Sequence, residues 1–355
     1  MAGGRVSEYA AVHARVRGMY ADMLTPETWI ALREAASYAA LIEILKETAY
    51  GSHLGEVADE NLTPRRAVYQ IKKHLADAFD VLAPLVPRLA RFLMIQLYHR
   101  YEVDNLKALM RGIERGTPWE QVRYVLFPLG SFTTLDAERL MEAEGVGAAV
   151  ERLRDTSYYD TLSHAMKRYT AEGSLFPLEV ALDLGYWREL WRDVDRLKGT
   201  DRAQARRIVG SLLDATNLMW AIRYRINHGL SEEEIINYTL PFGYRVHDED
   251  VRAIAAGADV VQVVTRVYPG LEGVSELLKE PQDGLPQLES QLQRHVVNEC
   301  RTAFVGYPFH IGVPAAYLIL TEFEIQDLTV LVEAKTSQMP AKRFRPYLLM
   351  GYMPE

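Results

Sequence analysis

The chain has 355 residues, 48% of them hydrophobic and 25% charged, a balance that is typical of a globular protein and excludes a disordered or fibrous one. Its 48 acidic side chains outnumber the 40 basic ones and give a formal net charge of −8, the reverse of what a general nucleic-acid binder shows. The single cysteine, Cys300, excludes an internal disulfide and a thiolate metal centre, and it is typical of a reducing compartment.

Apolar residues recur with the period of an α-helix along almost the whole chain. In chain order, such faces run from Tyr9 to Met23, from Val68 to Leu82 and from Phe92 to Ile113. The segment 260–267 is rich in valine, but its valines fall at i, i+1, i+3, i+4 and i+7 and predict a helix. The one Asp-Gly pair, Asp283-Gly284, lies in a stretch that we expect to be a polar connector, so no hairpin is indicated. The predicted fold class is all-α.

Capping residues predict where several of these helices begin. The pairs are Thr25-Pro26, Thr63-Pro64, Thr117 with Glu120, and Ser231 with Glu234. The first two place a capping hydroxyl before a proline at the first helical position, and the last two have the spacing of a capping box. The acidic residues 248–250 also fit a helix start, where carboxylates favour the helix dipole.

One short motif occurs three times, and it organises the chain. The pattern acid-x-x-(Asn or Asp)-Leu is found at Glu102, Asn105 and Leu106, at Asp214, Asn217 and Leu218, and at Glu324, Asp327 and Leu328. The flanking segments repeat in the same order, at a period near 110 residues. This period is too long for a solenoid repeat of about 20 to 50 residues. It predicts three similar helical bundles, which can stand in an open row or close about a pseudo-threefold axis.

The repeat gives the domain boundaries. Residues 1–24 are expected to form an extra N-terminal helix, followed by repeat units 25–130, 131–243 and 244–355. Two connectors that follow the motif, with Pro128 and Gly130 in one and Pro241 and Gly243 in the other, lie at equivalent places. Proline and glycine are typical of sharp turns there.

The acids of the motif have two interpretations. Glu102, Asp214 and Glu324 can form a shared functional site, or each acid or amide can tie its helix to a neighbouring backbone group. The second interpretation is favoured, because buried polar groups must be hydrogen-bonded.

Motifs of catalysis are absent from the sequence. There is no paired-histidine zinc motif, no phosphate-binding loop and no Asp-Asp-x-x-Asp cluster, so we expect no catalytic residue, cofactor or metal. The longest apolar run, from Ile311 to Leu320, has ten residues, well short of the ~20 that a membrane-spanning helix needs. The N-terminus has no signal-peptide core, so we expect a cytosolic chain. A small basic cluster, Lys342, Arg343 and Arg345, fits an anionic lipid or an acidic partner as well as a solvated helix face.

The residues around the motif resemble a known family. The stretch from Tyr101 to Gly112 resembles the most recognisable segment of the C subunit of the archaeal and bacterial V-type (A-type) ATPases, which corresponds to the d subunit of the eukaryotic vacuolar enzyme. The stretch 312–317 running into 322–325, and the aromatic stretch 182–187, are similar to the matching family segments. The third motif departs from the family at Asp327, where Asn is expected, and at Thr321, where a basic residue is common.

The resemblance implies a fold and a role. The fold would be three similar helical bundles in a funnel. The role would be a non-catalytic adapter on the cytoplasmic side of the cell membrane, between the membrane proteolipid ring and the central stalk, which transmits torque between proton (or sodium) flow and ATP synthesis or hydrolysis. Deleting a connector at Pro128–Gly130 or Pro241–Gly243 would then uncouple the complex without unfolding the chain. Two alternatives stay open, a helical protein–protein scaffold unrelated to rotary motors and an all-α enzyme.

Overall fold

A computed structural model describes residues 2–352, and the side chains from residue 5 onward. Within these residues every regular element is a helix, which confirms the predicted all-α class. The residues form two compact units. One, the split unit, combines the residues up to 51 with those from 197 onward, and the other, the continuous unit, consists of residues 52–196.

The continuous unit contains two long helices, α6 and α11, which pack against each other. Its elements are α4 (Gly51–Leu54, at the junction), η1 (Asp59–Asn61), α5 (Pro64–Leu82), η2 (Ala83–Leu85), α6 (Arg88–Glu114), α7 (Trp119–Val122), α8 (Ala137–Met141), α9 (Val146–Arg152), α10 (Tyr159–Glu172) and α11 (Phe176–Arg196). The short helices α8 and α9 pack on α6, and α10 packs on α11.

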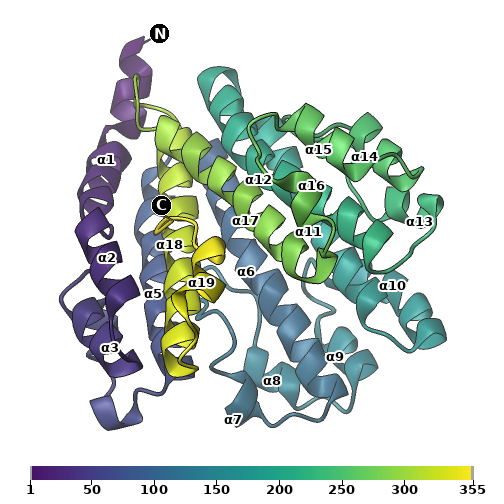
Figure 1. Ribbon diagram of the computed structural model, residues 1–355, viewed down its shortest axis with the longest axis horizontal. Coiled ribbons are helices and arrows are strands. Elements are labelled where there is room, and N and C mark those ends of the chain that lie inside the picture. The colour runs from purple at the N-terminus through teal and green to yellow at the C-terminus, as the bar shows by residue number, and fades with distance from the viewer. Residues whose placement is uncertain (1, 353–355) are drawn as a thin grey trace. The chain divides into compact units, whose positions relative to one another are not determined.

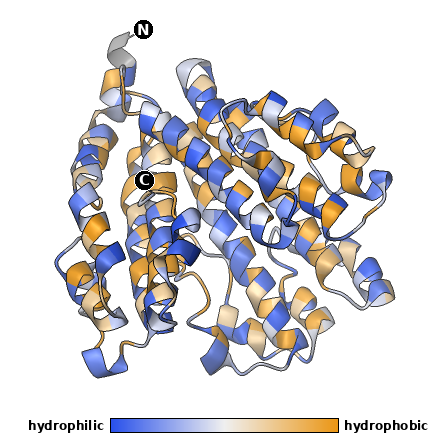
Figure 2. Ribbon diagram, viewed as in Figure 1, coloured by the Kyte–Doolittle hydropathy of each residue, from blue (hydrophilic) through white to orange (hydrophobic). Residues whose placement is uncertain are grey.

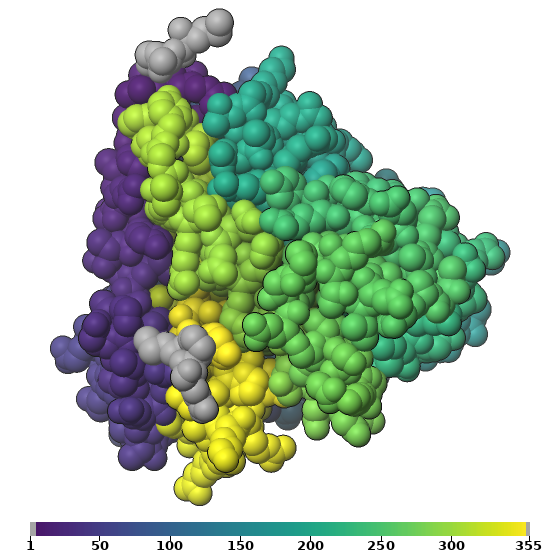
Figure 3. Space-filling model, turned by 45° about the horizontal axis from the view of Figure 1, so that its top comes forward, coloured from purple at the N-terminus to yellow at the C-terminus, as the bar shows by residue number. Residues whose placement is uncertain are grey.

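The split unit is built around three long helices, α12, α17 and α18, which contact one another. Its elements are α1 (Ala2–Ala21), α2 (Pro26–Glu34), α3 (Tyr38–Lys46), α12 (Gly199–Ile226), α13 (Glu232–Asn237), α14 (Asp248–Ala255), α15 (Val260–Val267), α16 (Val274–Leu277), α17 (Pro281–Thr302), α18 (Gly312–Thr336), α19 (Ala341–Phe344) and η3 (Arg345–Tyr347). In Figure 1 the purple helices α1–α3 lie beside the yellow α18, and both α1 and α3 contact it. Figure 3 shows the same neighbourhood on the surface, with purple N-terminal atoms next to yellow C-terminal ones.

Amphipathic helices make the core. Figure 2 shows hydrophobic and hydrophilic residues alternating along most helices, as expected when one face packs inward and the other meets solvent. Helix α18 is the exception, because nearly every residue from Gly312 to Leu328 is buried. A helix that is buried on all faces lies in the core of its unit, and its buried polar side chains need partners there.

Most predicted helix starts are confirmed. Thr25 and Thr63 cap α2 and α5 with a proline directly after them, and Ser231 forms a capping box with Glu234 at the start of α13. The valine-rich segment is the helix α15, and the Asp250 side chain accepts the His247 N–H at the start of α14.

Three details of the predicted elements are wrong. Helix α7 begins after Pro118 with no side-chain cap, so Thr117 does not cap it. Asp283 and Gly284 lie in the first turns of α17, because Pro281 starts that helix and the predicted connector does not exist. On α6, Phe92 is 46% exposed, since this turn buries its neighbours Leu93 and Met94. The division into three similar repeat units stays a prediction.

Candidate functional site: the repeated acid and amide motif

The three copies of the motif each lie in the middle of a long helix: α6 in the continuous unit, and α12 and α18 in the split unit. An acid and an amide three positions apart share one face of a helix, and the leucine after the amide packs inward. All nine of these side chains are buried: Glu102, Asn105, Leu106, Asp214, Asn217, Leu218, Glu324, Asp327 and Leu328. Each polar member therefore needs a hydrogen-bond partner inside the protein.

The two asparagines make the same pair of hydrogen bonds. Asn105 Nδ2 donates to the Phe127 carbonyl at 2.9 Å, and the Phe127 N–H donates back to Asn105 Oδ1 at 2.7 Å. Asn217 does the same with Leu240, at 2.8 Å and 2.9 Å. The partners lie 22 and 23 residues downstream. An amide can do this because it carries both a donor and an acceptor.

Asp327, the exception in the third motif, has a different set of partners. Its Oδ1 accepts the Leu349 N–H at 2.7 Å, and its Oδ2 accepts the N–H groups of Met350 and Gly351, both at 2.8 Å. The first partner again lies 22 residues downstream. Because an ionised carboxylate only accepts, the chain here presents three donors in place of one donor and one carbonyl.

The acid at the head of each motif binds backbone N–H groups from a distant loop. Glu102 accepts the Thr134 N–H at 2.5 Å, and Asp214 accepts those of Tyr244 and Arg245 at 2.8 Å and 2.6 Å. Glu324 accepts the Leu24 N–H at 3.0 Å. The donors at 24, 134 and 244 are spaced by 110 residues. The segment that serves α18 is thus the N-terminal counterpart of those that serve α6 and α12.

A tyrosine completes this arrangement at two of the three acids. The Tyr158 hydroxyl donates to Glu102, and the Tyr50 hydroxyl donates to Glu324 at 2.8 Å. Tyr268 occupies the corresponding place in sequence. Burial, and next the negative charge of Asp214, raise the pKa of Tyr268, which places its hydroxyl in the field of that carboxylate. The segment from Leu24 to Tyr50 is therefore held to α18 from both ends.

The glycines of the two predicted connectors are needed for close approach. A Cβ on Gly243 would lie 2.2 Å from Asp214 Oδ1 and 2.5 Å from the Val246 carbonyl oxygen. A Cβ on Gly130 would lie 2.7 Å from Asp80 Oδ2. Neither glycine has the positive φ of a glycine-specific turn, so it is the close approach that requires glycine here, and the sharp turns stay a prediction. Pro128 and Pro241 follow directly on the residues that Asn105 and Asn217 bind.

Burial dominates the electrostatics of the motif. It raises the pKa of Asp214 to about 6 and the pKa values of Glu324 and Asp327 to about 7, while their hydrogen bonds from N–H and O–H donors lower these values in part. Each of the three carboxylates is occupied by its own partners in the fold. The chemistry that this arrangement supports is fastening of helices to loops.

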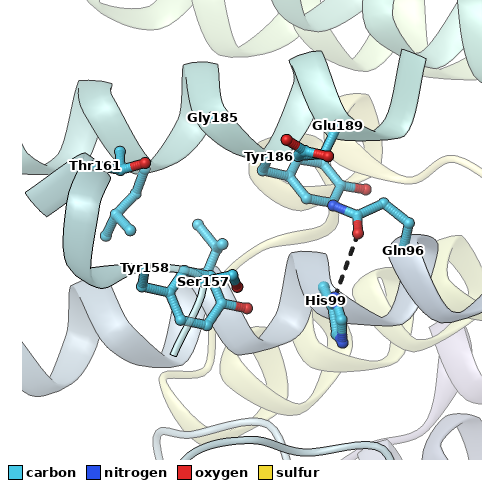
Figure 4. A pocket seen from close by; sticks show the side chains of 10 residues that line it. Gln96, His99, Ser157, Tyr158, Thr161, Gly185, Tyr186 and Glu189 are labelled. Carbon is cyan, nitrogen blue, oxygen red and sulfur yellow. Dashed lines mark hydrogen bonds between the residues drawn. The ribbon is translucent and has the colours of Figure 1, made fainter. Parts of the chain in front are cut away.

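A small cavity of about 280 Å³ lies next to the Glu102–Tyr158 hydrogen bond, between α6, α10 and α11. Figure 4 shows Tyr158 and Tyr186 on its walls, with His99 and Gln96 joined by a 3.3 Å hydrogen bond. Burial lowers the pKa of His99 below that of an exposed histidine. The sequence patterns did not indicate this cavity, because its lining residues come from three helices and share no motif.

The part of the chain that the structure describes holds neither a metal centre nor a membrane span. Among residues 2–352, no group of three or more His, Cys, Asp or Glu side chains is arranged to hold a metal ion. No helix in the same range combines the length and the apolar character needed to cross a bilayer. Cys300 is buried, and burial raises the pKa of its thiol. The basic residues Lys342 and Arg343 are exposed on α19.

The fold and the motif together define an all-helical protein whose long helices are fastened to loops by buried acids and amides. The family of ATP synthase (C/AC39) subunits matches residues 12–347, and the chain belongs to this family. Similar proteins include the C subunit of the A-type ATP synthase of Methanocaldococcus jannaschii, 25% identical over 97% of this chain and 87% of the relative. The corresponding C subunits of Methanococcoides burtonii and Pyrococcus abyssi are 24% and 22% identical, over 98% and 93% of this chain and 96% and 87% of theirs.

Proposed function

We propose that the chain is a non-catalytic adapter subunit of a rotary A-type (V-type) ATPase or ATP synthase. It would join the membrane proteolipid ring to the central stalk on the cytoplasmic side of the membrane and transmit torque between ion translocation and ATP chemistry. The observation that carries this proposal is the family match over residues 12–347, together with relatives named as the C subunit of A-type ATP synthases that align over nearly the whole chain.

The buried motif supports a mechanical role. A torque-transmitting part must deform little under load, and well-packed interiors have low compressibility. In both units a long helix is tied to a loop 22 or 23 residues downstream, so the connectors do not swing freely about the helices. The connectors with Pro128 and Pro241 are therefore positioned by side chains of the helix wall, as parts of a coupling surface would need to be.

The proposal is tested by assembling the rotary complex with and without this chain. Co-purification with the proteolipid ring and ATP-driven ion pumping in reconstituted vesicles are the two measurements. We expect the complex without the chain to hydrolyse ATP but to pump poorly. A complex that pumps equally well without the chain would contradict the adapter role.

The connectors can be tested in the same assay. Deleting Leu129 or Phe242 shortens one connector and leaves the bonded pairs Asn105–Phe127 and Asn217–Leu240 in place. We expect reduced pumping with helicity retained by circular dichroism. Unaltered pumping in both variants would remove these connectors from the coupling path and leave the adapter role to the first experiment.

A further inference from the structure

A second cavity in the continuous unit lies against the connector at Pro128. Its volume is about 490 Å³, within the range of roughly 300–1,000 Å³ that is usual for binding pockets. Residues of α5, α7 and α8 form the walls, and the segment 126–129 forms one side. All of the lining residues belong to the continuous unit.

Cationic and aromatic side chains line this cavity. The cations are Arg66, Lys73 and Arg123, and the aromatic rings include Tyr69, Trp119 and Tyr124. Tyr69 and Tyr124 meet edge to face with their ring centroids 5.6 Å apart. On a chain with net charge −8, the walls of this recess carry three cations and one acid, Glu138. Arginine and aromatic residues together are typical of protein interfaces.

Arg66 is the cation available to a partner. Lys73 pairs with Glu56 at 2.5 Å, and Arg123 pairs with Glu120 at 3.1 Å. Arg66 stacks over the Tyr124 ring at 5.6 Å and has no carboxylate within ion-pair distance among the residues that the structure describes. Since a guanidinium carries five N–H donors, this stacking leaves donors for a carboxylate.

Gln70 adds a requirement for a hydrogen-bond donor in the occupant of this cavity. Its side chain is 5% exposed and lines the cavity, and its Oε1 is buried without a hydrogen-bond donor among the described residues. A buried unsatisfied acceptor costs free energy, so the site favours an occupant that brings a donor. A simple anion presents mainly acceptors, whereas a peptide presents an N–H at every residue except proline.

We propose that this cavity is a docking site for a short acidic segment of a partner protein, whose carboxylate pairs with Arg66 and whose backbone N–H donates to Gln70. The inference rests on the proposed function, because the partner would be another subunit of the same complex. Docking here also places the partner against the connector that Asn105 fixes, which joins binding to the predicted coupling surface.

The first experiment is site-specific crosslinking in the assembled complex. A benzoylphenylalanine at Trp119 replaces one large aromatic side chain in the cavity wall by another, and the same residue at Tyr159, which does not line the cavity, is the control. We expect the Trp119 position alone to crosslink to a partner peptide with Asp or Glu within a few residues of the attachment. Attachment to a nucleotide or a lipid, to a peptide without acidic residues, or to nothing would overturn the inference.

A charge reversal gives the second readout. Arg66→Glu is compared with Arg65→Glu, an exposed neighbour outside the cavity. We expect Arg66→Glu to reduce the crosslink yield at least about tenfold, and Arg65→Glu to leave it within about twofold. Similar melting temperatures for the two variants would show that both fold. Equal crosslink yields would overturn the inference while leaving the adapter role intact, since that role is tested separately by co-purification and by ion pumping with and without the chain.

Discussion

At the scale of single residues, Gly243 has less space for a side chain than Gly130, the glycine of the other connector. A methyl group there would meet the Val246 backbone carbonyl and the Asp214 carboxylate, and the carboxylate cannot move away without straining the hydrogen bonds that it accepts from Tyr244 and Arg245. We expect Gly243→Ala to lower the free energy of unfolding by about 2–3 kcal/mol, because an added methyl group overpacks this site. Urea denaturation of the variant and the wild type measures this difference.

Gly147 is the matched control for that substitution. It lies in α9, and an added Cβ would meet only Met166 Cε at an ordinary 3.7 Å. Gly147→Ala should be neutral or stabilise the fold by up to about 1 kcal/mol, because alanine favours a helix. If the two variants had the same stability, the close approach at Gly243 would have no energetic weight.

Which residues matter in the motif could be predicted from the sequence, but their partners could not. The spacing of Glu102, Asn105 and Leu106 places the two polar groups on one face, and the burial of both follows from the apolar stripe around them. The partner of Asn105 lies 22 residues downstream in an irregular segment, for which no periodicity exists. Since backbone N–H groups carry no sequence signal, only coordinates identify such donors.

At the scale of elements, predicted helix starts succeeded where the cap is a local interaction. Thr25, Thr63 and Ser231 each bond within three residues of themselves, so sequence spacing is sufficient information. The prediction that Thr117 caps α7 is wrong, although the spacing from Thr117 to Glu120 is that of a capping box. The Thr117 N–H instead donates to the Gly112 carbonyl at the end of α6, so it belongs to the preceding helix end.

The segment from Leu24 to Tyr50 offers a test of how one element is held to another. Tyr50→Phe removes the hydroxyl that donates to the buried Glu324 and leaves the Leu24 N–H as its other hydrogen-bond donor. We expect a loss of about 1–3 kcal/mol in the free energy of unfolding, the usual cost of an unsatisfied buried acceptor. Hydrogen exchange should increase for the amides of residues 24–50.

The control for this variant is Tyr347→Phe, which deletes a hydroxyl at a half-buried position in η3. It should change neither the stability by more than about 0.5 kcal/mol nor the exchange of residues 24–50. Equal effects of the two substitutions would show that the Tyr50–Glu324 bond does not hold the segment.

At the scale of the whole molecule, the two compact units and the three predicted repeats divide the chain at different places, and the division into repeats stays a prediction. The repeat period places residues 25–51 with the residues that follow them, whereas the structure places them in the split unit with α18. The hydrogen bonds explain this, because Tyr50, Thr134 and Tyr244, each in the first part of one predicted repeat, bond to the acid of the motif helix of another repeat. A period shows which segments are alike, and it does not show which of them pack together.

The same three buried carboxylates make the stability of the whole chain depend on pH. Burial raises the folded-state pKa of Asp214 to about 6 and those of Glu324 and Asp327 to about 7, above the ~4 of an unfolded chain. Between these values the folded state binds more protons than the unfolded state. The three protonated side chains therefore contribute their full stabilisation of the folded state below about pH 4. This contribution is lost as the pH rises through 6 to 7.

Asp327→Asn tests this dependence, because it returns the third motif to the asparagine of the first two. The variant keeps an oxygen acceptor for the Leu349 N–H but stays neutral at every pH. In urea denaturation at about pH 5 and about pH 8, its stability should fall by about 1–3 kcal/mol less than that of the wild type. Removing the exposed carboxylate in Asp155→Asn should leave the wild-type fall unchanged. An equal fall in wild type and Asp327→Asn would mean that Asp327 is ionised in the fold at both pH values, with its three N–H donors outweighing the cost of burial.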